Sequence, residues 1–325
     1  MAIACELRGE RIGYDLGLIV TLTMNPAVDR NVTADRLVFE DRAYILANFE
    51  SAGGRGINAS RVIHAFGGAT LAIAPFGGKS GRRLEELVAD AGFPVELVRI
   101  RSEIRINLAI SDKQGLTVKL NELGPRLSQD ELARLEKRVA ASMESAAWLM
   151  LCGSLPPGVP NDFYAKLIGL ARARGVKTML DTDGDPLRAG LEAGPTVVTP
   201  NQHEAERLLS RALLTRNHFL EAASRIREHG AESVVLSLGS RGAVGSFEGR
   251  LYEALPPRVD AVCPIGSGDA LAAAFVWSMS RTQDLPDALR WGVAAGTASA
   301  KLPGLTFASL EQTRAVYRQV EVRSA

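Results

Sequence analysis

A short run of small residues leads directly into a carboxylate and a strong helix signal. Gly266, Ser267, Gly268 and Asp269 are followed by the apolar, alanine-rich stretch 270–275. Small residues at a helix start leave backbone N–H groups free, and the helix dipole adds partial positive charge, so an anion is stabilised there. A lone aspartate at this position is usually a cap. Beside an anion-binding turn, however, it supplies the proton acceptor that phosphoryl transfer to an alcohol needs.

A second glycine-rich segment lies near the N-terminal end of the chain. Gly53, Gly54, Arg55 and Asn58 precede an apolar-periodic stretch, and glycines before a helix let backbone N–H groups approach a ligand. The segment formally satisfies a dinucleotide fingerprint, but that motif expects an acidic residue about 20 positions later. No Asp or Glu occurs between residues 51 and 84, so a nicotinamide site is poorly supported.

Two other phosphate-binding patterns are incomplete or common. Residues 78–80 end like a P-loop, but Ile73 stands where the first glycine belongs, which excludes that motif. Asn201 and Glu204 lie at an ordinary helix start, and the glycine turn 237–242 follows a predicted strand. Neither feature predicts a site by itself.

Composition excludes several classes of protein. The chain has 325 residues, 46% of them hydrophobic, and 38 Lys and Arg against 37 Asp and Glu leave a net charge of +1. This balance disfavours nucleic-acid binding. The longest apolar run, 270–277, is far below the roughly 20 residues that cross a bilayer. The charged first 16 residues do not form an export signal, and three scattered cysteines suit a reducing compartment, so we expect a cytoplasmic protein.

Short β-rich runs alternate with helical stretches, which predicts an α/β fold with a mostly parallel central sheet between helical layers. Ser128 and Glu131 form a capping-box pattern ahead of a helix with one apolar face. The predicted strands cover residues 18–22, 70–76, 148–152, 177–180, 196–199 and 234–238.

A small accessory sheet is predicted beside the main one. The runs 105–110 and 116–120 flank a turn and predict a hairpin, and residues 44–50 form a separate strand candidate. Strand alternation places Arg105 and Asn107 on one face and the aliphatic residues of that strand on the other. From the strand alone, a solvated face is the commoner reason for such a pattern. We expect these strands to form a lid on one domain.

Taken in order, these segments resemble the ribokinase-like (PfkB) family of carbohydrate kinases, in its phosphosugar branch. That branch includes 1-phosphofructokinase, tagatose-6-phosphate kinase and the minor 6-phosphofructokinase. The resemblance implies a three-layer sandwich with a small β-sheet lid over residues 17–325, lid strands from about 28–50 and 95–120, and a separate N-terminal extension at 1–16. The matching segments are 21–29, 53–62, 105–108, 153–158, 201–204, 237–242 and 266–269.

The resemblance also implies roles for individual residues. Asp269 would be the catalytic base, with Gly266, Ser267 and Gly268 as the anion hole. Substrate and cofactor residues follow by matching position. Asp29, Gly53, Gly54 and Asn58 would hold the sugar hydroxyls, Arg105, Arg42 and Ser154 would bind its phosphate, and Arg55 and Asn107 would be further substrate-binding residues. Asn201, Ser237, Gly239 and Gly242 would bind ATP, and Glu204 would act indirectly on Mg²⁺.

Three positions depart from the branch pattern. Arg55 replaces a usual Lys, Thr199 stands where a Lys often precedes Pro200, and Pro264 precedes the anion hole where a Thr-rich sequence is common. Loss of a cation at Thr199 raises the question of how the nucleotide is bound.

The expected activity is ATP-dependent phosphorylation of a ketohexose monophosphate, such as fructose 1-phosphate, fructose 6-phosphate or tagatose 6-phosphate, to the bisphosphate. Two alternatives stay open at this point: a kinase for an unphosphorylated sugar or nucleoside, and a catalytically silent sugar-phosphate-binding protein. Two cations in a neutral-sugar pocket would lack a partner, which disfavours the first. Because a lid sheet has unpaired edges, we also expect a homodimer through the lid.

Overall fold

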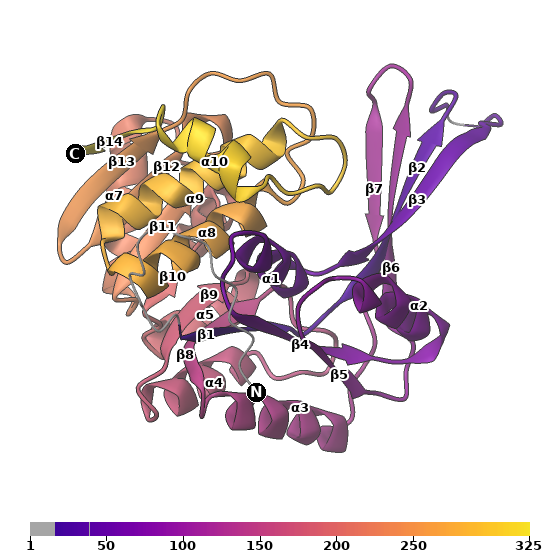
Figure 1. Ribbon diagram of the computed structural model, residues 1–325, viewed down its shortest axis with the longest axis horizontal. Coiled ribbons are helices and arrows are strands. Elements are labelled where there is room, and N and C mark those ends of the chain that lie inside the picture. The colour runs from indigo at the N-terminus through magenta and orange to yellow at the C-terminus, as the bar shows by residue number, and fades with distance from the viewer. Residues whose placement is uncertain (1–16, 39) are drawn as a thin grey trace, which may run out of the picture.

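The computed structural model describes residues 17–38 and 40–325, and a ten-stranded sheet forms its centre (Figure 1). Neighbours from β5 to β11 pair in parallel, and those from β11 to β14 are antiparallel. The predicted α/β class and mostly parallel sheet are therefore confirmed. In spatial order the strands are β14 (Glu321–Ser324), β13 (Arg250–Leu255), β12 (Ala243–Phe247), β11 (Ser233–Ser237), β10 (Val197–Val198), β9 (Lys177–Asp181), β8 (Ala146–Cys152), β1 (Leu18–Thr23), β4 (Thr70–Phe76) and β5 (Val95–Arg99).

Helices cover both faces of this sheet and make a three-layer structure (Figure 1). Alternate residues of β8 enter different cores: Trp148 and Met150 pack with α1, α8, α9 and α10, whereas Leu149 and Leu151 pack with α3, α4, α5 and α7. The helices are α1 (Arg55–Ala65), α2 (Gly78–Ala89), α3 (Gln129–Ser142), α4 (Phe163–Arg172), α5 (Gly184–Glu192), α6 (Gln202–Leu209), α7 (Arg216–Glu228), α8 (Ser267–Thr282), α9 (Leu285–Ala300) and α10 (Leu310–Tyr317).

A capping box explains the start of α3, and helix packing explains the position of α8. The predicted capping box of α3 is present, because the Glu131 amide donates to Ser128 Oγ and the Ser128 amide donates to Glu131 Oε2 at 2.8 Å. Helix α8 lies between α1 and α9, and every residue from Ala270 to Met279 is buried. Its alanines let the neighbouring helices approach closely, which holds the start of α8 in one position.

A separate four-stranded sheet projects from the main body in the order β3-β2-β6-β7 (Figure 1). It comprises β3 (Ile45–Gly53), β2 (Ala27–Ala34), β6 (Arg105–Asp112) and β7 (Thr117–Asn121). The predicted hairpin is confirmed as β6 and β7.

Two details of the predicted lid are corrected. Residues 95–99 form β5, which pairs with β4 in the large sheet, so the second lid segment begins at Arg105 rather than near 95. Strand β3 is longer than the predicted 44–50 and ends at Gly53, because its last residues pair with the start of β2. The proposed N-terminal extension, 1–16, lies outside the described residues.

The register of the small sheet sets which side chains share its inner face. Asp29 on β2 lies opposite Asn107 on β6, and Asn107 lies opposite Asn121 on β7. Directly opposed residues point to the same side of a sheet. Three strands thus contribute polar side chains to one face. In the described part of the chain, no helix is long and apolar enough to span a membrane.

Candidate active site

Asp269 lies in the first turn of α8 and is half-buried. Gly266 precedes the helix with φ of 80°, a left-handed conformation that favours glycine, and a Cβ there would lie 2.7 Å from Leu305 Cδ1. Of the expected anion-hole donors, the Ser267 amide already donates to Pro264 O at 3.2 Å. The Gly266 and Gly268 amides have no backbone acceptor within the described ranges, so both are free to meet an anion.

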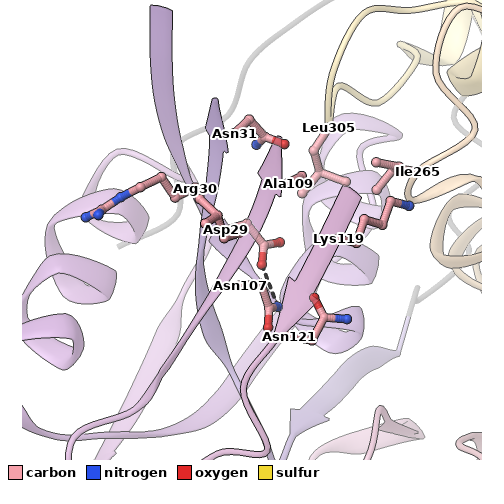
Figure 2. Close-up of a pocket in the computed structure, with 10 residues that line it drawn as sticks. Asp29, Arg30, Asn31, Asn107, Ala109, Lys119, Asn121, Ile265 and Leu305 are labelled. Atoms are coloured by element: carbon pink, nitrogen blue, oxygen red, sulfur yellow. Dashed lines mark hydrogen bonds between the residues drawn. The ribbon is translucent and has the colours of Figure 1, made fainter. Parts of the chain in front are cut away.

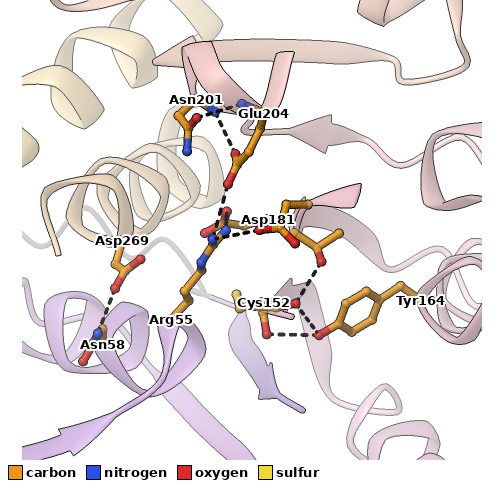
Figure 3. A network of polar contacts seen from close by, with 11 residues as sticks. Arg55, Asn58, Cys152, Tyr164, Asp181, Asn201, Glu204 and Asp269 are labelled. Atoms are coloured by element: carbon orange, nitrogen blue, oxygen red, sulfur yellow. Dashed lines mark hydrogen bonds and ion pairs between the residues drawn. The ribbon is translucent and has the colours of Figure 1, made fainter. Parts of the chain in front are cut away.

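The Asp269 carboxylate is held by a residue from a different part of the chain. Asn58 Nδ2 on α1 donates to Asp269 Oδ2 at 2.8 Å (Figure 3). Burial and the nearby Asp181 carboxylate raise the pKa of Asp269 to about 7, while the Asn58 hydrogen bond and the Arg55 charge oppose this rise. A carboxyl group with that pKa can accept a proton near neutral pH.

Arg55 joins three carboxylates at the ends of neighbouring elements (Figure 3). Its Nη1 lies 2.8 Å from Asp181 Oδ1, and its Nη2 lies 3.3 Å from Glu204 Oε1 and 3.9 Å from Asp183 Oδ2. The planar guanidinium group reaches these oxygens with separate nitrogens, which a single ammonium group could not do in the same way. Arg55, expected to bind the sugar, therefore extends to this acidic group.

Glu204 and Asn201 form a second capping box at the start of α6. The Asn201 amide donates to Glu204 Oε2, and the Glu204 amide donates to Asn201 Oδ1, both at 2.9 Å. Burial raises the pKa of Glu204, and the charge of Arg55 partly offsets that effect. Both carboxylate oxygens of Glu204 are thus occupied within the protein.

This arrangement does not fit a directly ligated metal ion. No group of three or more His, Cys, Asp or Glu side chains within residues 17–38 and 40–325 could hold one. Asp181, Asp183 and Glu204 instead surround Arg55. A divalent cation would have to arrive with the nucleotide.

A pocket of about 200 Å³ opens on the inner face of the small sheet (Figure 2). Asn107 Nδ2 donates to Asp29 Oδ1 at 2.8 Å, and burial raises the pKa of Asp29 against the effects of Asn107 and Arg105. A Cβ at Gly53 would lie 2.4 Å from the Asp29 carboxyl group, so only glycine lets β3 pass this side chain. Lys119 and Ile265 also line the pocket.

Arg105 and Ser154 come together through Asn25. Arg105 Nε donates to Asn25 O at 3.2 Å, and Asn25 Nδ2 donates to Ser154 Oγ at 3.3 Å. Burial lowers the pKa of Arg105, although Asp29 raises it. The buried Oδ1 atoms of Asn25 and Asn107 have no hydrogen-bond partner within the described ranges. The guanidinium group of Arg105 is suited to a phosphate group, whereas these free amide oxygens can accept hydrogen bonds from hydroxyl groups.

Arg42 does not join this group in one chain. It is exposed on the segment between β2 and β3. Asp29 lies five residues before the end of β2, which is about 17 Å along a strand. Arg42 therefore does not contribute to the substrate-binding residues of its own chain, because the lid strands place it far from the pocket.

A second pocket, of about 340 Å³, collects the expected nucleotide residues. Asn201, Ser237, Gly239 and Gly242 line it together with Ser267 and Gly268. Much of the remaining lining is apolar, which suits a planar base, and includes Pro256, Val259, Leu271, Val293 and Ala300. Thr199 is buried, and its Oγ1 has no partner among the described residues.

Sequence reasoning missed several residues of this site. Asp181 ends a buried strand of a parallel sheet, a position where ligand-binding residues commonly lie, and that signal was available. Asn25 follows β1 in the same way. Lys119 gave no signal, because its place opposite Ala109 depends on the hairpin register.

Comparison with known proteins identifies the family. The sequence pattern of pfkB family carbohydrate kinases matches residues 23–313. The chain belongs to this family. The chain is 34% identical to ATP-dependent 6-phosphofructokinase isozyme 2 of Escherichia coli, over 92% of this chain and 97% of the relative. It is 30% identical to 1-phosphofructokinase of Borreliella burgdorferi, over 87% and 92% respectively.

Solved structures agree with this assignment. Phosphofructokinase-2 from Escherichia coli in complex with fructose-6-phosphate superposes with a TM-score of 0.86 at 33% identity, over 93% of this chain and 99% of that one. Arabidopsis thaliana ribokinase, at 19% identity, has a TM-score of 0.76 over 93% and 99%, which confirms the ribokinase-like fold. This PfkB carbohydrate kinase is accordingly a phosphotransferase that acts on an alcohol group.

We expect Asp269→Asn to reduce the kcat of this kinase about 10²- to 10⁴-fold, because the amide cannot accept a proton. The melting temperature at pH 8 should not fall, since a carboxylate whose pKa is raised by burial destabilises the fold when ionised. Steady-state kinetics and thermal unfolding test this together. A kcat within a few-fold of wild type, with the fold intact, contradicts the assignment of the base.

The kcat/KM of the kinase should rise with pH through about 7, because only the ionised Asp269 is an active base. In the Asn58→Ala variant this rise in kcat/KM should occur at higher pH, because the Asn58 hydrogen bond lowers the pKa of Asp269. The substrate phosphate ionises near pH 6 in both proteins, so the shift between them reports the enzyme group. If the rise in kcat/KM occurs at the same pH in both proteins, another group controls the pH profile.

Proposed function

We propose that this chain transfers the γ-phosphoryl group of ATP to a hydroxyl of a ketohexose monophosphate, giving a bisphosphate and ADP. One observation carries the proposal: the turn 264–269 borders both pockets. Ile265 lines the pocket of the small sheet, whereas Ser267 and Gly268 line the pocket of the expected nucleotide residues. Asp269 follows this turn directly, so a carboxyl group with a pKa of about 7 lies next to the turn that borders both pockets.

The proposed chemistry follows from this placement. Asp269 takes the proton from the attacking hydroxyl as its oxygen bonds to the γ-phosphorus, and the bond to the β-phosphate oxygen breaks to release ADP. The free Gly268 amide and the positive end of the α8 dipole stabilise charge on the transferred group. Closure of the small sheet over the pocket would exclude water, which competes as an acceptor.

The substrate class rests on charged residues in and next to the pocket of the small sheet. Arg105 lies on β6, two residues before Asn107, which lines that pocket. Arg105, with Asn25 and Ser154 beside it, supports binding of a phosphate group already on the sugar. Asp29 and Asn107 offer an acceptor and unpaired amide atoms for sugar hydroxyls. Lys119, which forms no ion pair in the described part of the chain, adds a second cation at the rim.

ATP is expected to bind as its magnesium complex, with the cation counted as part of the substrate. The 340 Å³ pocket supports the nucleotide assignment, since its glycine turn offers backbone donors and much of its remaining lining is apolar. Glu204 would act indirectly, by holding Arg55 and the Asn201 amide in position. Thr199 contributes no charge, whereas Arg55 pairs with Glu204, the capping-box partner of Asn201.

A substrate panel tests this function. We expect ADP release with fructose 1-phosphate, fructose 6-phosphate or tagatose 6-phosphate, and far less with fructose. Arg105→Gln should lower kcat/KM for the sugar phosphate about 10- to 150-fold, which corresponds to the ~1.5–3 kcal/mol of a hydrogen bond to a charged group.

The KM for ATP serves as the internal control and should change by less than about twofold in Arg105→Gln, because Arg105 lies on the small sheet and does not line the 340 Å³ pocket. Arg105→Lys keeps the charge and should recover part of the loss. Activity on fructose that equals activity on its phosphates would overturn the phosphosugar assignment. Tight sugar-phosphate binding with no ADP release would favour a silent binding protein.

We also propose that two chains associate through the small sheet. Strands β3 and β7 are its edges, and apolar side chains on them are strongly exposed, including Ile45 at 65% and Phe49 at 61%. Exposed edges and apolar patches of this kind favour pairing with another chain. A dimer would cover this surface.

The double variant Ile45→Asp/Phe49→Asp should convert a dimer to a monomer, because it places charge in the buried contact. Size-exclusion chromatography with light scattering measures the mass of each protein. Leu214→Asp is a matched control, since Leu214 is 76% exposed and lies outside the small sheet. A wild-type protein that is already monomeric, or a double variant that stays dimeric, rules out this interface.

A further inference from the structure

A wide groove with a basic lining lies away from both pockets, between the end of β5 and the start of α3. Its volume is about 980 Å³. We call it the hinge groove and define it by six of its lining residues: Arg99, Arg101, Arg126, Ser128, Glu131 and Arg134.

The four arginines of the hinge groove are exposed, and none forms an ion pair in the part of the chain that the structure describes. Arg138, one turn further along α3, differs because it pairs with Glu96. Among the four, only Arg134 has a side-chain hydrogen bond, from Nη2 to Arg99 O at 3.1 Å. Four guanidinium groups around one concave surface produce a positive potential that attracts anions.

The two carboxylates of the groove, Asp130 and Glu131, offset only part of this charge, because four arginines outnumber them. Glu131 Oε1 accepts from the Arg101 amide at 2.6 Å, and Glu131 Oε2 accepts from the Ser128 amide at 2.8 Å, so both oxygens are engaged by backbone donors. Asp130, which also lines the groove, is exposed to solvent. The start of the 14-residue helix α3 adds its dipole to the positive side.

The position of the groove connects it to the lid. The chain leaves β5 at Arg99, passes Arg101 and enters β6 at Arg105; it returns from β7 through Arg126 to α3. The hinge groove is thus lined by both connections between the main body and the β6–β7 hairpin. The Arg101 amide already joins them through Glu131.

The same connections hold the proposed phosphate-binding residue. Arg105 Nη1 donates to Glu122 O at 3.2 Å, and Asn25 Nδ2 donates to Leu123 O at 2.9 Å. Arg126 packs against Gly158, on the loop after β8 that also carries Ser154. A change in the relative position of the two connections would therefore move Arg105 and Ser154.

We propose that the hinge groove binds a small metabolite bearing two phosphate groups, and that this ligand bridges Arg99 and Arg101 on one connection to Arg126 and Arg134 on the other. The bridge stabilises the arrangement in which Arg105 reaches Asn25, so the ligand lowers the KM for the sugar phosphate. The regulatory half of the proposal rests on the proposed function; the binding half does not. Linkage requires the sugar phosphate to strengthen binding in the groove by the factor by which the ligand lowers the Kd of the sugar phosphate.

Inorganic pyrophosphate is the probe, and calorimetry without magnesium measures its binding to the full chain. Arg101→Gln/Arg126→Gln removes one charge from each connection, and Arg314→Gln/Arg318→Gln removes two exposed charges at α10 as a matched control. We expect the groove variant to lose one class of site, with affinity there reduced about tenfold or more, while the control retains it. Isotherms that are equal in all three proteins overturn the site.

Kinetics test the regulatory half at fixed free magnesium. Pyrophosphate should lower the KM for the sugar phosphate about fivefold or more in wild type and in the control, and should not do so in the groove variant. If pyrophosphate binds in the groove but the KM for the sugar phosphate does not change, the regulatory half of the proposal is overturned and the binding half is supported. Three further ligands distinguish the sources of the two phosphate groups: inorganic phosphate, ADP and a sugar bisphosphate. The binding of each is measured by calorimetry in Asp269→Asn, with and without the groove substitutions. If pyrophosphate binds in the groove but the protein has no kinase activity, only the proposed function is contradicted.

Discussion

The carboxylate of Asp269 must remain able to ionise while it is buried beside the turn that borders two pockets, and much of the structure serves that condition. Burial and Asp181 favour its neutral form, whereas Asn58 and Arg55 favour the ionised one. Both influences are needed. Without Asn58 and Arg55 the carboxyl group would stay protonated at neutral pH, and without burial its carboxylate would be too weak a base. The close packing of α8 against α1 keeps Asn58 and Asp269 in contact.

Arg55 extends this balance to the nucleotide side. It is the only side chain drawn in Figure 3 that reaches from the region of Asp269 to Asp181 and Glu204. Three carboxylates around one guanidinium group leave the region slightly acidic, which suits a substrate that brings its own divalent cation. The departure from the usual Lys at this position therefore has a structural use, because the guanidinium fork can meet several carboxylates at once.

Much of the fold could be predicted because its signals are local. The capping box at Ser128, the β6–β7 hairpin and the alternation that puts Arg105 and Asn107 on one face each involve neighbouring residues. The predicted lid boundary near residue 95 was wrong because β5 has the same short, apolar pattern as a lid strand; only its pairing with β4 assigns it to the large sheet. Arg42 was misplaced for a related reason, since a motif position does not reveal how far a strand extends.

The sequence by itself determined the α/β class, the family and the identity of the candidate base, because motif order, strand spacing and helix starts are written in consecutive residues. Only the tertiary structure decided which side chains meet. Asn58 and Asp269 are 211 residues apart, Arg55 and Asp181 are 126 apart, and Asp29 and Asn107 are 78 apart. Such contacts depend on sheet order and register, and a shift of one residue would turn each side chain to the opposite face.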